Sequence, residues 1–264
     1  MKSFKIDQVL TDDGSFTIRH PVYDEEFHSK TGARRETLEL YMKASGYSEH
    51  LQNCHNPIGI LDVGLGLGYN ALMTIEFWMQ SPGLTDLHML SLEHTEALVE
   101  ALTDPETAWK EGWSHEWKLW SQELKKNSAS HWSCKLTHPL TGKTLYWSTQ
   151  VGDARDANFE GCAFDFIWQD AFSSKKNPEL WTPEWFSKIA RASKPEVSLV
   201  TYSVARLVRD NLEAATWKQG RSVLRGLLLL TSRPSSRRPR AGAEAAAAGR
   251  AFGRRSSRPA PRGA

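Results

Sequence analysis

The chain has 264 residues, which is enough for one α/β domain with a substantial core. It has no apolar run near the roughly 20 residues that a membrane-spanning helix needs, and residues 1–6 lack the apolar core of a signal peptide. Its three scattered cysteines argue against a disulfide framework or a cysteine-rich metal site. The formal net charge of +2 is uneven, because residues 218–264 hold 11 Arg, one Lys and one Glu, which leaves residues 1–217 at −9. We therefore expect a cytoplasmic protein without a membrane segment or a metal, and its acidic body is unusual for a nucleic-acid binder.

Residues 1–50 form a polar N-terminal segment. Residues 16–18 alternate weakly between polar and apolar side chains, which is typical of a strand in a small hairpin. Residues 35–44 are predicted to form a helix. His28, between these elements, has two interpretations: it contacts a ligand, or it packs inside the fold.

A strand, a glycine-rich turn and a helix are predicted next. Residues 58–63 are an apolar run typical of a buried strand, and the apolar positions after Gly68 predict a helix to about residue 80. The turn between them holds Gly64, Gly66 and Gly68. Such a unit lets the backbone approach a ligand closely and aims the N-terminus of the helix at it.

The spacing of the glycines and the acid before them favour a cationic ligand. Dinucleotide sites carry the pattern G-x-G-x-x-G, whereas this chain has G-x-G-x-G preceded by Asp62. A carboxylate repels a pyrophosphate and attracts a cation, such as the amino-acid end of S-adenosylmethionine. A tight turn without any ligand is the alternative.

Glu93 ends a second apolar run, residues 87–93, which begins about 20 residues after the glycines. In a βαβ unit the acid at this point can hold both hydroxyl groups of a ribose. The alternative interpretation is a glutamate in a solvated loop.

Two helical segments are predicted after Glu93, over residues 95–102 and 105–126. Four indoles lie along one face of the second segment: Trp109, Trp113, Trp117 and Trp120. These indoles either stack on nucleic-acid bases or pack against the sheet. We favour packing.

Residues 133–136 and 144–151 are predicted to pair as strands around a turn at residues 141–143. The second strand leads into Asp153, at the edge of an open α/β sheet where ligands bind. Asp153 either accepts a hydrogen bond from an adenine amino group or caps a helix, and both interpretations remain open.

Residues 163–168 predict a fourth strand, which leads to Asp170, and residues 197–202 predict a fifth. Helices are expected between these strands, over residues 181–190, and after them, over residues 205–217. This alternation of strands and helices predicts an α/β fold with a mostly parallel sheet and helices on both faces.

The loop after the fourth strand is specific enough to indicate a family. Residues 170–182 read Asp-Ala-Phe-Ser-Ser-Lys-Lys-Asn-Pro-Glu-Leu-Trp-Thr. They resemble the signature of the methyltransferase half of the MnmC family of tRNA 5-methylaminomethyl-2-thiouridine biosynthesis proteins. The glycine turn at residues 62–70, the segment at residues 23–29 and the strand at residues 199–203 are also similar to this family.

The resemblance covers about residues 12–217 and implies a Rossmann-like class I S-adenosyl-L-methionine-dependent methyltransferase. Its implied substrate is the amine of 5-aminomethyl-2-thiouridine at the wobble position of tRNA. The family often carries a flavin domain as well, and we expect the amine-generating step to belong to a separate protein. The alternatives are a class I methyltransferase that acts on a small amine, and an inactive remnant of the fold.

The matched positions also imply site residues. Asp170 is expected to be catalytic, because a carboxylate at this strand end can orient the amine and accept its proton. The implied cofactor-binding residues are Asp62, Gly64, Gly66, Gly68, Asn70, Glu93, Asp153 and Asp170. The implied substrate loop comprises Lys175, Lys176, Asn177 and Trp181. Its two lysines either contact tRNA phosphates or are simply solvated, and Ser174 replaces the family's usual proline.

The chain departs from the family after Trp217. We expect an N-terminal segment over residues 1–50 that packs on the domain, a methyltransferase domain over residues 51–217, and an Arg/Ala/Pro-rich tail over residues 218–264. The composition of the tail predicts disorder. A basic RNA-binding arm is the alternative.

The family closes its sheet with a strand pair and a basic element, which we expect to be missing or replaced here. A frameshift near residues 216–220 is our hypothesis for the break in composition. The edge beside the fifth strand would then be bare unless residues 223–231 pair with it by accident. Such a chain would bind tRNA weakly, and its activity would be impaired.

Overall fold

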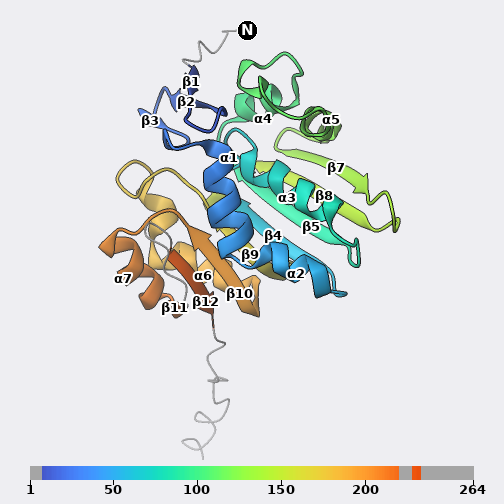
Figure 1. The fold of residues 1–264 in the computed structure, drawn as a ribbon. Coiled ribbons are helices and arrows are strands. Elements are labelled where there is room, and N and C mark those ends of the chain that lie inside the picture. Colours follow the sequence, from blue (N-terminus) through green and yellow to red (C-terminus); the bar gives the residue numbers. More distant parts are fainter. Residues whose placement is uncertain (1–7, 220–227, 233–264) are drawn as a thin grey trace, which may run out of the picture. The chain divides into compact units, whose positions relative to one another are not determined.

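The computed structural model of the chain describes residues 8–219 and 228–232. Within these residues one nine-stranded sheet and one three-stranded sheet form (Figure 1). The large sheet has the order β11-β12-β10-β9-β4-β5-β8-β7-β6. Its strands are β4 (Ile58–Val63), β5 (Leu87–Glu93), β6 (Lys125–Lys126), β7 (His131–Thr137), β8 (Thr144–Val151), β9 (Phe164–Gln169), β10 (Ser193–Thr201), β11 (Trp217–Gln219) and β12 (Leu228–Ser232).

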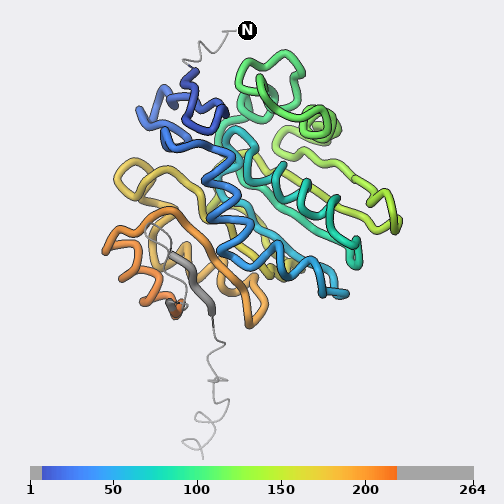
Figure 2. The backbone as a smooth tube through the Cα atoms, viewed as in Figure 1, coloured from blue at the N-terminus to red at the C-terminus, as the bar shows by residue number. Residues whose placement is uncertain are grey.

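The five central strands of this sheet, β10, β9, β4, β5 and β8, are parallel to one another. The chain proceeds from β4 through β5 to β8 and then returns to β9 and β10 on the other side of β4 (Figure 2). In such a sheet, ligands bind at the carboxyl ends of the strands where the order reverses. The predicted α/β fold with a mostly parallel sheet is confirmed, and so is the hairpin of β7 and β8.

Helices cover both faces of the sheet (Figure 1). One face carries α2 (Tyr47–Asn53), α3 (Tyr69–Gln80) and the π-helix η1 (Thr37–Ala44), which follows α1 (Ala33–Glu36). The other face carries α6 (Pro183–Arg191) and α7 (Arg206–Ala214). The shorter elements are α4 (Glu96–Thr103), α5 (His115–Glu123) and the 3-10 turns η2 (Ala108–Lys110), η3 (Ala154–Asp156) and η4 (Pro178–Trp181).

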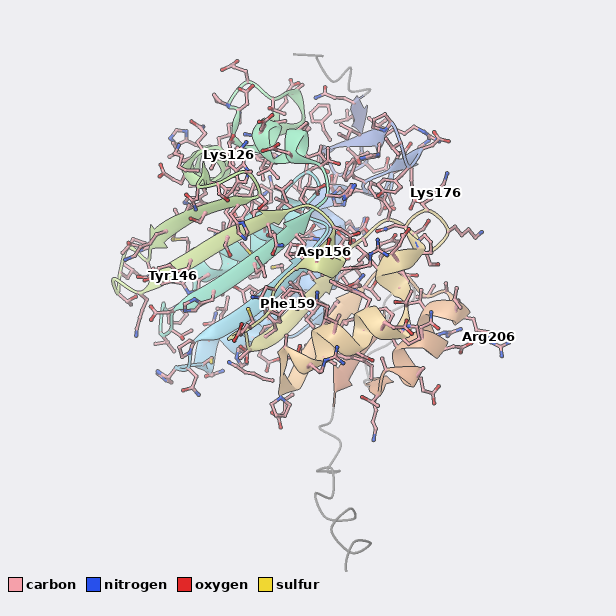
Figure 3. All side chains as sticks on the ribbon, turned by 180° about the vertical axis from the view of Figure 1, so that it is seen from behind. Lys126, Tyr146, Asp156, Phe159, Lys176 and Arg206 are labelled. Atoms are coloured by element: carbon pink, nitrogen blue, oxygen red, sulfur yellow. The ribbon has the colours of Figure 1, made fainter. Side chains whose placement is uncertain are left out.

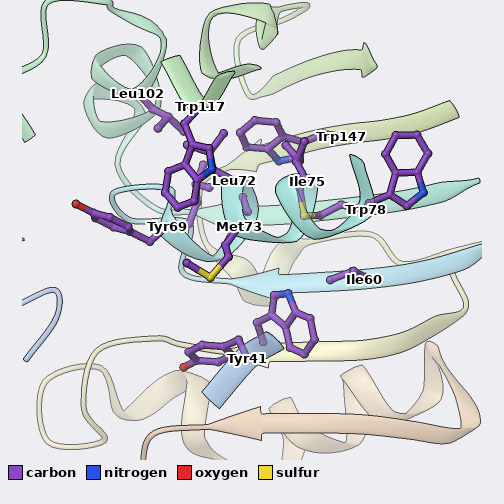
Figure 4. Packing of buried hydrophobic residues seen from close by; sticks show 14 of the residues in the cluster. Tyr41, Ile60, Tyr69, Leu72, Met73, Ile75, Trp78, Leu102, Trp117 and Trp147 are labelled. Atoms are coloured by element: carbon purple, nitrogen blue, oxygen red, sulfur yellow. The ribbon is translucent and has the colours of Figure 1, made fainter. Parts of the chain in front are cut away.

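Two hydrophobic clusters hold these layers together. In the larger cluster, Leu72 and Trp78 of α3 are fully buried with Ile60 of β4 (Figure 4). In the second, Phe186 of α6 and Val208 of α7 pack on the opposite face. A parallel sheet that is buried on both faces requires apolar side chains on both sides of its strands, which explains the continuous apolar runs of the sequence.

The predicted tryptophan helix is broken. Gly112 has a φ of 82° and separates η2 from α5, which begins after the helix cap Ser114. A continuous helix over residues 105–126 was therefore a wrong prediction. The packing interpretation of the indoles is confirmed for three of them, because Trp109, Trp113 and Trp117 are buried in the larger cluster.

The N-terminal segment forms a small antiparallel sheet of β1 (Gln8–Leu10), β2 (Phe16–His20) and β3 (Glu25–Glu26). The Tyr69 side chain ties this sheet to α3, because its hydroxyl group donates to the Phe16 carbonyl at 2.9 Å and accepts from the Phe16 N–H at 3.2 Å. The predicted hairpin is thus present, and it is fastened at the N-terminus of α3.

The sheet edge beside β10 is not bare. β12 pairs with β10 in antiparallel fashion and β11 pairs with β12, so a strand pair stands where we expected an open edge. Trp217 of β11 is buried, and its indole N–H donates to the Phe186 carbonyl at 3.1 Å. The edge is thus not bare, and the alternative that residues 223–231 pair with it is confirmed for residues 228–231. The other predictions for residues 220–227 and 233–264 lie outside the described residues.

The burial of Trp217 gives a test of this edge. We expect Trp217→Ala to lower the free energy of unfolding by about 3–5 kcal/mol, because it removes a large buried ring and the donor to Phe186. Urea denaturation followed by circular dichroism measures the change. Lys218→Ala, an exposed change in the same strand, is the control and should alter the free energy by less than about 0.5 kcal/mol. Equal stability of the two variants would show that β11 does not pack as described.

Candidate active site

A cavity of about 730 Å³ lies at the carboxyl ends of the parallel strands, between the glycine turn and the small N-terminal sheet. This size is typical of a site for a nucleoside-sized ligand. Eight of the residues predicted from the sequence line it: Gly64, Gly66, Asn70, Glu93, Asp153, Asp170, Lys176 and Asn177. The edge of the sheet therefore brings together residues that lie far apart in the sequence.

The glycine turn is fixed to the end of β5. The N–H groups of Gly64 and Leu65 donate to the Leu92 carbonyl, each at 3.0 Å. The Glu93 carboxylate accepts from the Gly66 N–H at 2.9 Å and from the Thr95 N–H at 2.9 Å. Glu93 is thus a structural acceptor for the turn, in addition to facing the cavity.

Gly64 shows why the turn needs glycine. It has a φ of 89°, and a Cβ atom there would lie 2.7 Å from the Asp170 carbonyl oxygen. The backbone of the turn and the end of β9 are therefore closer than any larger residue allows. This approach brings Asp170 next to the turn.

The carboxylate of Asp170 is held by two donors, one from η1 and one from α3. The Tyr41 hydroxyl donates to Oδ1 at 2.6 Å, and the Asn70 side-chain amide donates to Oδ2 at 2.7 Å. Thr37 fixes the orientation of that amide by donating to Asn70 Oδ1 at 2.9 Å. Two helices, η1 and α3, thus hold one carboxylate at the end of β9.

The helix predicted over residues 35–44 is confirmed, and from Thr37 to Ala44, where it supplies two of these side chains, it is a π-helix. Thr37 and Tyr41 are four residues apart and both reach the site. A π-helix is rare and frequently lies at a functional site. Neither residue was predicted from the sequence, because nothing in the local pattern distinguishes a π-helix from an α-helix.

Burial is the main influence on Asp170. It raises the pKa of the Asp170 carboxyl group to about 7, and the negative charge of Glu36 adds to this rise, while the hydrogen bonds from Tyr41 and Asn70 oppose it. The group can therefore gain and lose a proton near neutral pH. A carboxylate with this property in a cavity is a candidate general base.

Asp153 has the opposite environment. Its side chain caps η3 by accepting from the Arg155 N–H at 2.9 Å, and the Arg155 guanidinium contacts its Oδ2 at 2.6 Å. The hydrogen bond with Arg155 lowers the pKa of Asp153 to about 2. The helix-cap interpretation of Asp153 is confirmed, and the same carboxylate, always ionised at neutral pH, lines the cavity.

An aromatic wall, which we define as His20, Tyr23, Phe27 and Phe172, lines the cavity beside Asp170. The ring of Phe172 lies 4.6 Å from that of Tyr23 and 5.0 Å from that of Phe27, measured between centroids. Glu25 fastens this wall to the loop after β9, since it accepts from the Ser173 hydroxyl at 2.7 Å. The segments at residues 23–29 and 170–182 were singled out in the sequence, but their contact with each other was not predicted.

Comparisons with known proteins agree with this geometry. Residues 115–223 match the model of a family described as S-adenosyl-L-methionine-dependent methyltransferase. The chain is 30% identical over 200 residues to the tRNA 5-methylaminomethyl-2-thiouridine biosynthesis bifunctional protein MnmC of Azoarcus sp.. The crystal structure of MNMC2 from Aquifex aeolicus superposes with a TM-score of 0.69 at 27% identity, covering 86% of this chain and 69% of that one.

The chain belongs to the S-adenosyl-L-methionine-dependent methyltransferases related to MnmC. The match to the Azoarcus protein covers 73% of this chain and 30% of that protein. The MnmC of Leptospira interrogans is 25% identical over 217 residues, which are 80% of this chain and 32% of that protein. The methyltransferase thus spans about a third of the length of these relatives.

S-adenosyl-L-methionine fits the residues of this cavity. The glycine turn offers a close backbone, and the carboxylates of Glu93 and Asp170 lie at the ends of β5 and β9, on either side of β4. A ligand that carries a positive sulfonium, an ammonium group and ribose hydroxyls matches such a set of acceptors. Within residues 8–219 and 228–232, no cluster of three or more His, Cys, Asp or Glu side chains could hold a metal ion. No helix of that part of the chain is both long and apolar enough to cross a bilayer.

Four of the predicted residues of the methyltransferase do not line the cavity: Asp62, Gly68, Lys175 and Trp181. Gly68 begins α3 with a φ of 87°, and a Cβ atom there would lie 2.6 Å from the Leu102 side chain. Trp181 is buried, and its indole donates to the Phe172 carbonyl at 2.8 Å. Gly68 thus allows α3 to pack closely against Leu102 of α4. Trp181 holds the backbone of the loop after β9, and Lys175 is exposed on that loop.

Asp62 is buried beneath the glycine turn and does not face the cavity. Its Oδ2 accepts from the Ser91 hydroxyl at 2.8 Å, and its Oδ1 has no partner among the described residues. Burial raises the pKa of Asp62 to about 8. The direct ligand contact expected of Asp62 is therefore replaced by a contact within the core.

His28 is buried at the cavity wall. Its ring packs edge-on against Tyr69 with 5.2 Å between centroids, and its backbone N–H donates to Thr17 Oγ1 at 3.0 Å. Burial lowers the pKa of His28, so the neutral form prevails. The contacts with Tyr69 and Thr17 support the interpretation that His28 packs inside the fold, and contact of His28 with a ligand stays a prediction.

The raised pKa of Asp62 predicts a stability that depends on pH. In the folded state the Asp62 carboxyl group keeps its proton up to about pH 8, whereas in the unfolded state it loses the proton near its ordinary pKa of 3.8. Between these two pH values the unfolded state binds fewer protons, so Asp62 lowers the free energy of unfolding as the pH rises. Asn is neutral throughout. We expect the free energy of unfolding of Asp62→Asn, relative to wild type, to rise between pH 5 and pH 9 by more than about 1 kcal/mol. Urea denaturation at each pH measures it, and a difference independent of pH would contradict a protonated Asp62.

Proposed function

We propose that this methyltransferase transfers a methyl group from S-adenosyl-L-methionine to the amine of 5-aminomethyl-2-thiouridine at the wobble position of tRNA. The names of the MnmC relatives and the loop at residues 170–182 support this substrate. The observation that carries the proposal is the position of Asp170, a carboxylate beside the glycine turn whose pKa of about 7 suits proton transfer from an amine. A class I methyltransferase acting on a small amine is the other reading of the same carboxylate.

The cofactor half of the site would follow the strand ends in order. Gly64, Gly66 and Asn70 would contact the methionine end, Glu93 the ribose hydroxyls and Asp153 the adenine. The hydrogen bonds of Glu93 to two backbone N–H groups support this assignment, because they fix its carboxylate at the cavity wall. The Arg155 ion pair does the same for Asp153.

The catalytic role falls to Asp170. S-adenosyl-L-methionine supplies a methyl group on a positively charged sulfur, which an unprotonated amine can attack. Asp170 would orient the amine and accept its proton, and Tyr41 and Asn70 would keep the carboxylate in one orientation. Most of the rate enhancement of such a displacement comes from positioning.

The loop after β9 would receive the tRNA. Lys176 and Asn177 lie at the cavity rim, and Figure 3 shows Lys176 on the outside of this loop. Lys175 is exposed on the same loop. The positive charges of Lys175 and Lys176 suit tRNA phosphates. With tRNA as its substrate the protein would work in the cytoplasm, and a separate enzyme would generate the amine.

The direct test is incubation of the protein with undermodified tRNA and labelled S-adenosyl-L-methionine, followed by mass analysis of the nucleosides. We expect Asp170→Asn to lower the rate of methyl transfer by about 100-fold or more and to change the dissociation constant of the cofactor by less than about threefold. Asp210→Asn, an exposed control on α7, should be unaffected. Unchanged turnover of Asp170→Asn would remove the residue from its role, and labelling of free amines instead of tRNA would favour the small-amine alternative.

The pKa of Asp170 sets a pH dependence. Because burial raises it to about 7, the carboxyl group is largely protonated at pH 6 and cannot take a proton from the amine. The rate should therefore rise about tenfold per pH unit below pH 7 and level off above it. Initial rates from pH 5 to pH 9 measure this profile. A maximum below pH 6 would contradict the role of Asp170 as a base.

A further inference from the structure

Glu36 is a half-buried carboxylate that ends α1 and lines the cavity. Its Oε2 accepts from the Ser29 hydroxyl at 3.1 Å, which restrains the side chain. No ion pair among residues 8–219 and 228–232 includes Glu36. Its charge therefore remains available to a ligand.

The position of Glu36 puts it at the acceptor end of the cavity. The next residue, Thr37, holds Asn70, and Tyr41 on the following π-helical turn holds Asp170. The negative charge of Glu36 also contributes to the raised pKa of Asp170, of Tyr41 and of Tyr202, which stands at the end of β10. Asp170 and Tyr202 line the same cavity as Glu36, whereas Tyr41 is buried behind it.

The other carboxylates of the cavity have partners within the chain. Arg19 contacts two of them and Arg155 a third, while Ser173, Asn177 and two backbone N–H groups hold the rest. The carboxylates with these partners are Asp24, Glu25, Glu26, Glu93, Asp153 and Glu179. Of these, only Asp24, Glu26 and Asp153 therefore contact a guanidinium. Glu36 and Asp170, like Glu25, Glu93 and Glu179, have neutral donors and keep an uncompensated charge when ionised.

We propose that Glu36 determines the specificity of the methyl-acceptor site by binding the substrate amine in its protonated form and holding it beside Asp170. This inference rests on the proposed function for the identity of the acceptor, an aminomethyl group on a pyrimidine. The aromatic wall beside the two carboxylates suits the flat face of such a base. The site would then select a basic amine against a neutral group of the same size.

The charges of the reaction balance with this arrangement. The amine enters as an ammonium ion paired with Glu36 and gives one proton to the Asp170 carboxylate. Its lone pair then forms the new N–C bond as the S–C bond breaks, and the electron pair of that bond stays on the sulfur. The products are a methylated ammonium ion, still paired with Glu36, and a neutral thioether. Asp170 returns its proton to water.

The test compares Glu36→Gln with Glu39→Gln. Glu39 lies on the same helix, is exposed and pairs with Lys43 at 2.9 Å outside the cavity, so its variant is a matched control for loss of one charge. Calorimetric titration at pH 6.5, with S-adenosylhomocysteine present, compares two probes, 5-aminomethyluridine and 5-hydroxymethyluridine. They differ only in the amine, so the ratio of their dissociation constants reports recognition of its charge.

We expect the wild type and Glu39→Gln to bind the aminomethyl probe about tenfold or more tightly than the hydroxymethyl probe. In Glu36→Gln this ratio should fall to about twofold or less, with the affinity for S-adenosylhomocysteine unchanged. The proposal would be overturned if Glu36→Gln kept the tenfold preference for the aminomethyl probe, or if the wild type showed no such preference. It would also be overturned if Glu36→Gln lost affinity only for S-adenosylhomocysteine. If the preference behaves as expected but undermodified tRNA is not methylated, the proposed tRNA function fails and the role of Glu36 stands.

Discussion

The hydrogen bonds that end on the Asp170 carboxylate are the constraint on which the site depends. Tyr41 comes from the π-helix and Asn70 from the start of α3, and both donate to a residue at the end of β9. Such donors stabilise a half-buried carboxylate, because an unpaired buried oxygen costs free energy. Burial raises the pKa of the group, and the two hydrogen bonds limit that rise while they fix the orientation of the carboxylate.

The carboxylates of the cavity differ in their partners. The Arg155 guanidinium neutralises Asp153, whereas backbone N–H groups hold Glu93, and hydroxyl or amide groups hold Glu36 and Asp170. In the proposed reaction, the uncompensated charges of Glu36 and Asp170 would attract a positive amine.

Much of the fold and part of the site could be predicted from the sequence. Apolar runs mark the parallel strands, and an acid at the end of each run must reach the same sheet edge, which is why Glu93, Asp153 and Asp170 were found. Tyr41 and Glu36 were not found, because the contact of Tyr41 with Asp170 spans 129 positions and its π-helical turn has no local sequence signature. Residues 223–231 were recognised as able to pair beside β10, and β12 lies among them, but β11 was not predicted because residues 205–217 were expected to be helical.

The proposed role of Asp170 depends on a half-buried carboxyl group with a pKa near neutrality. A carbon-13 NMR titration of the labelled aspartate carboxyl groups, assigned by comparison with Asp170→Asn, measures this value directly. The account predicts that the Asp170 signal titrates near pH 7, as burial requires. A midpoint below pH 5 would contradict the account, because the carboxylate would then be too weak a base to take a proton from the amine.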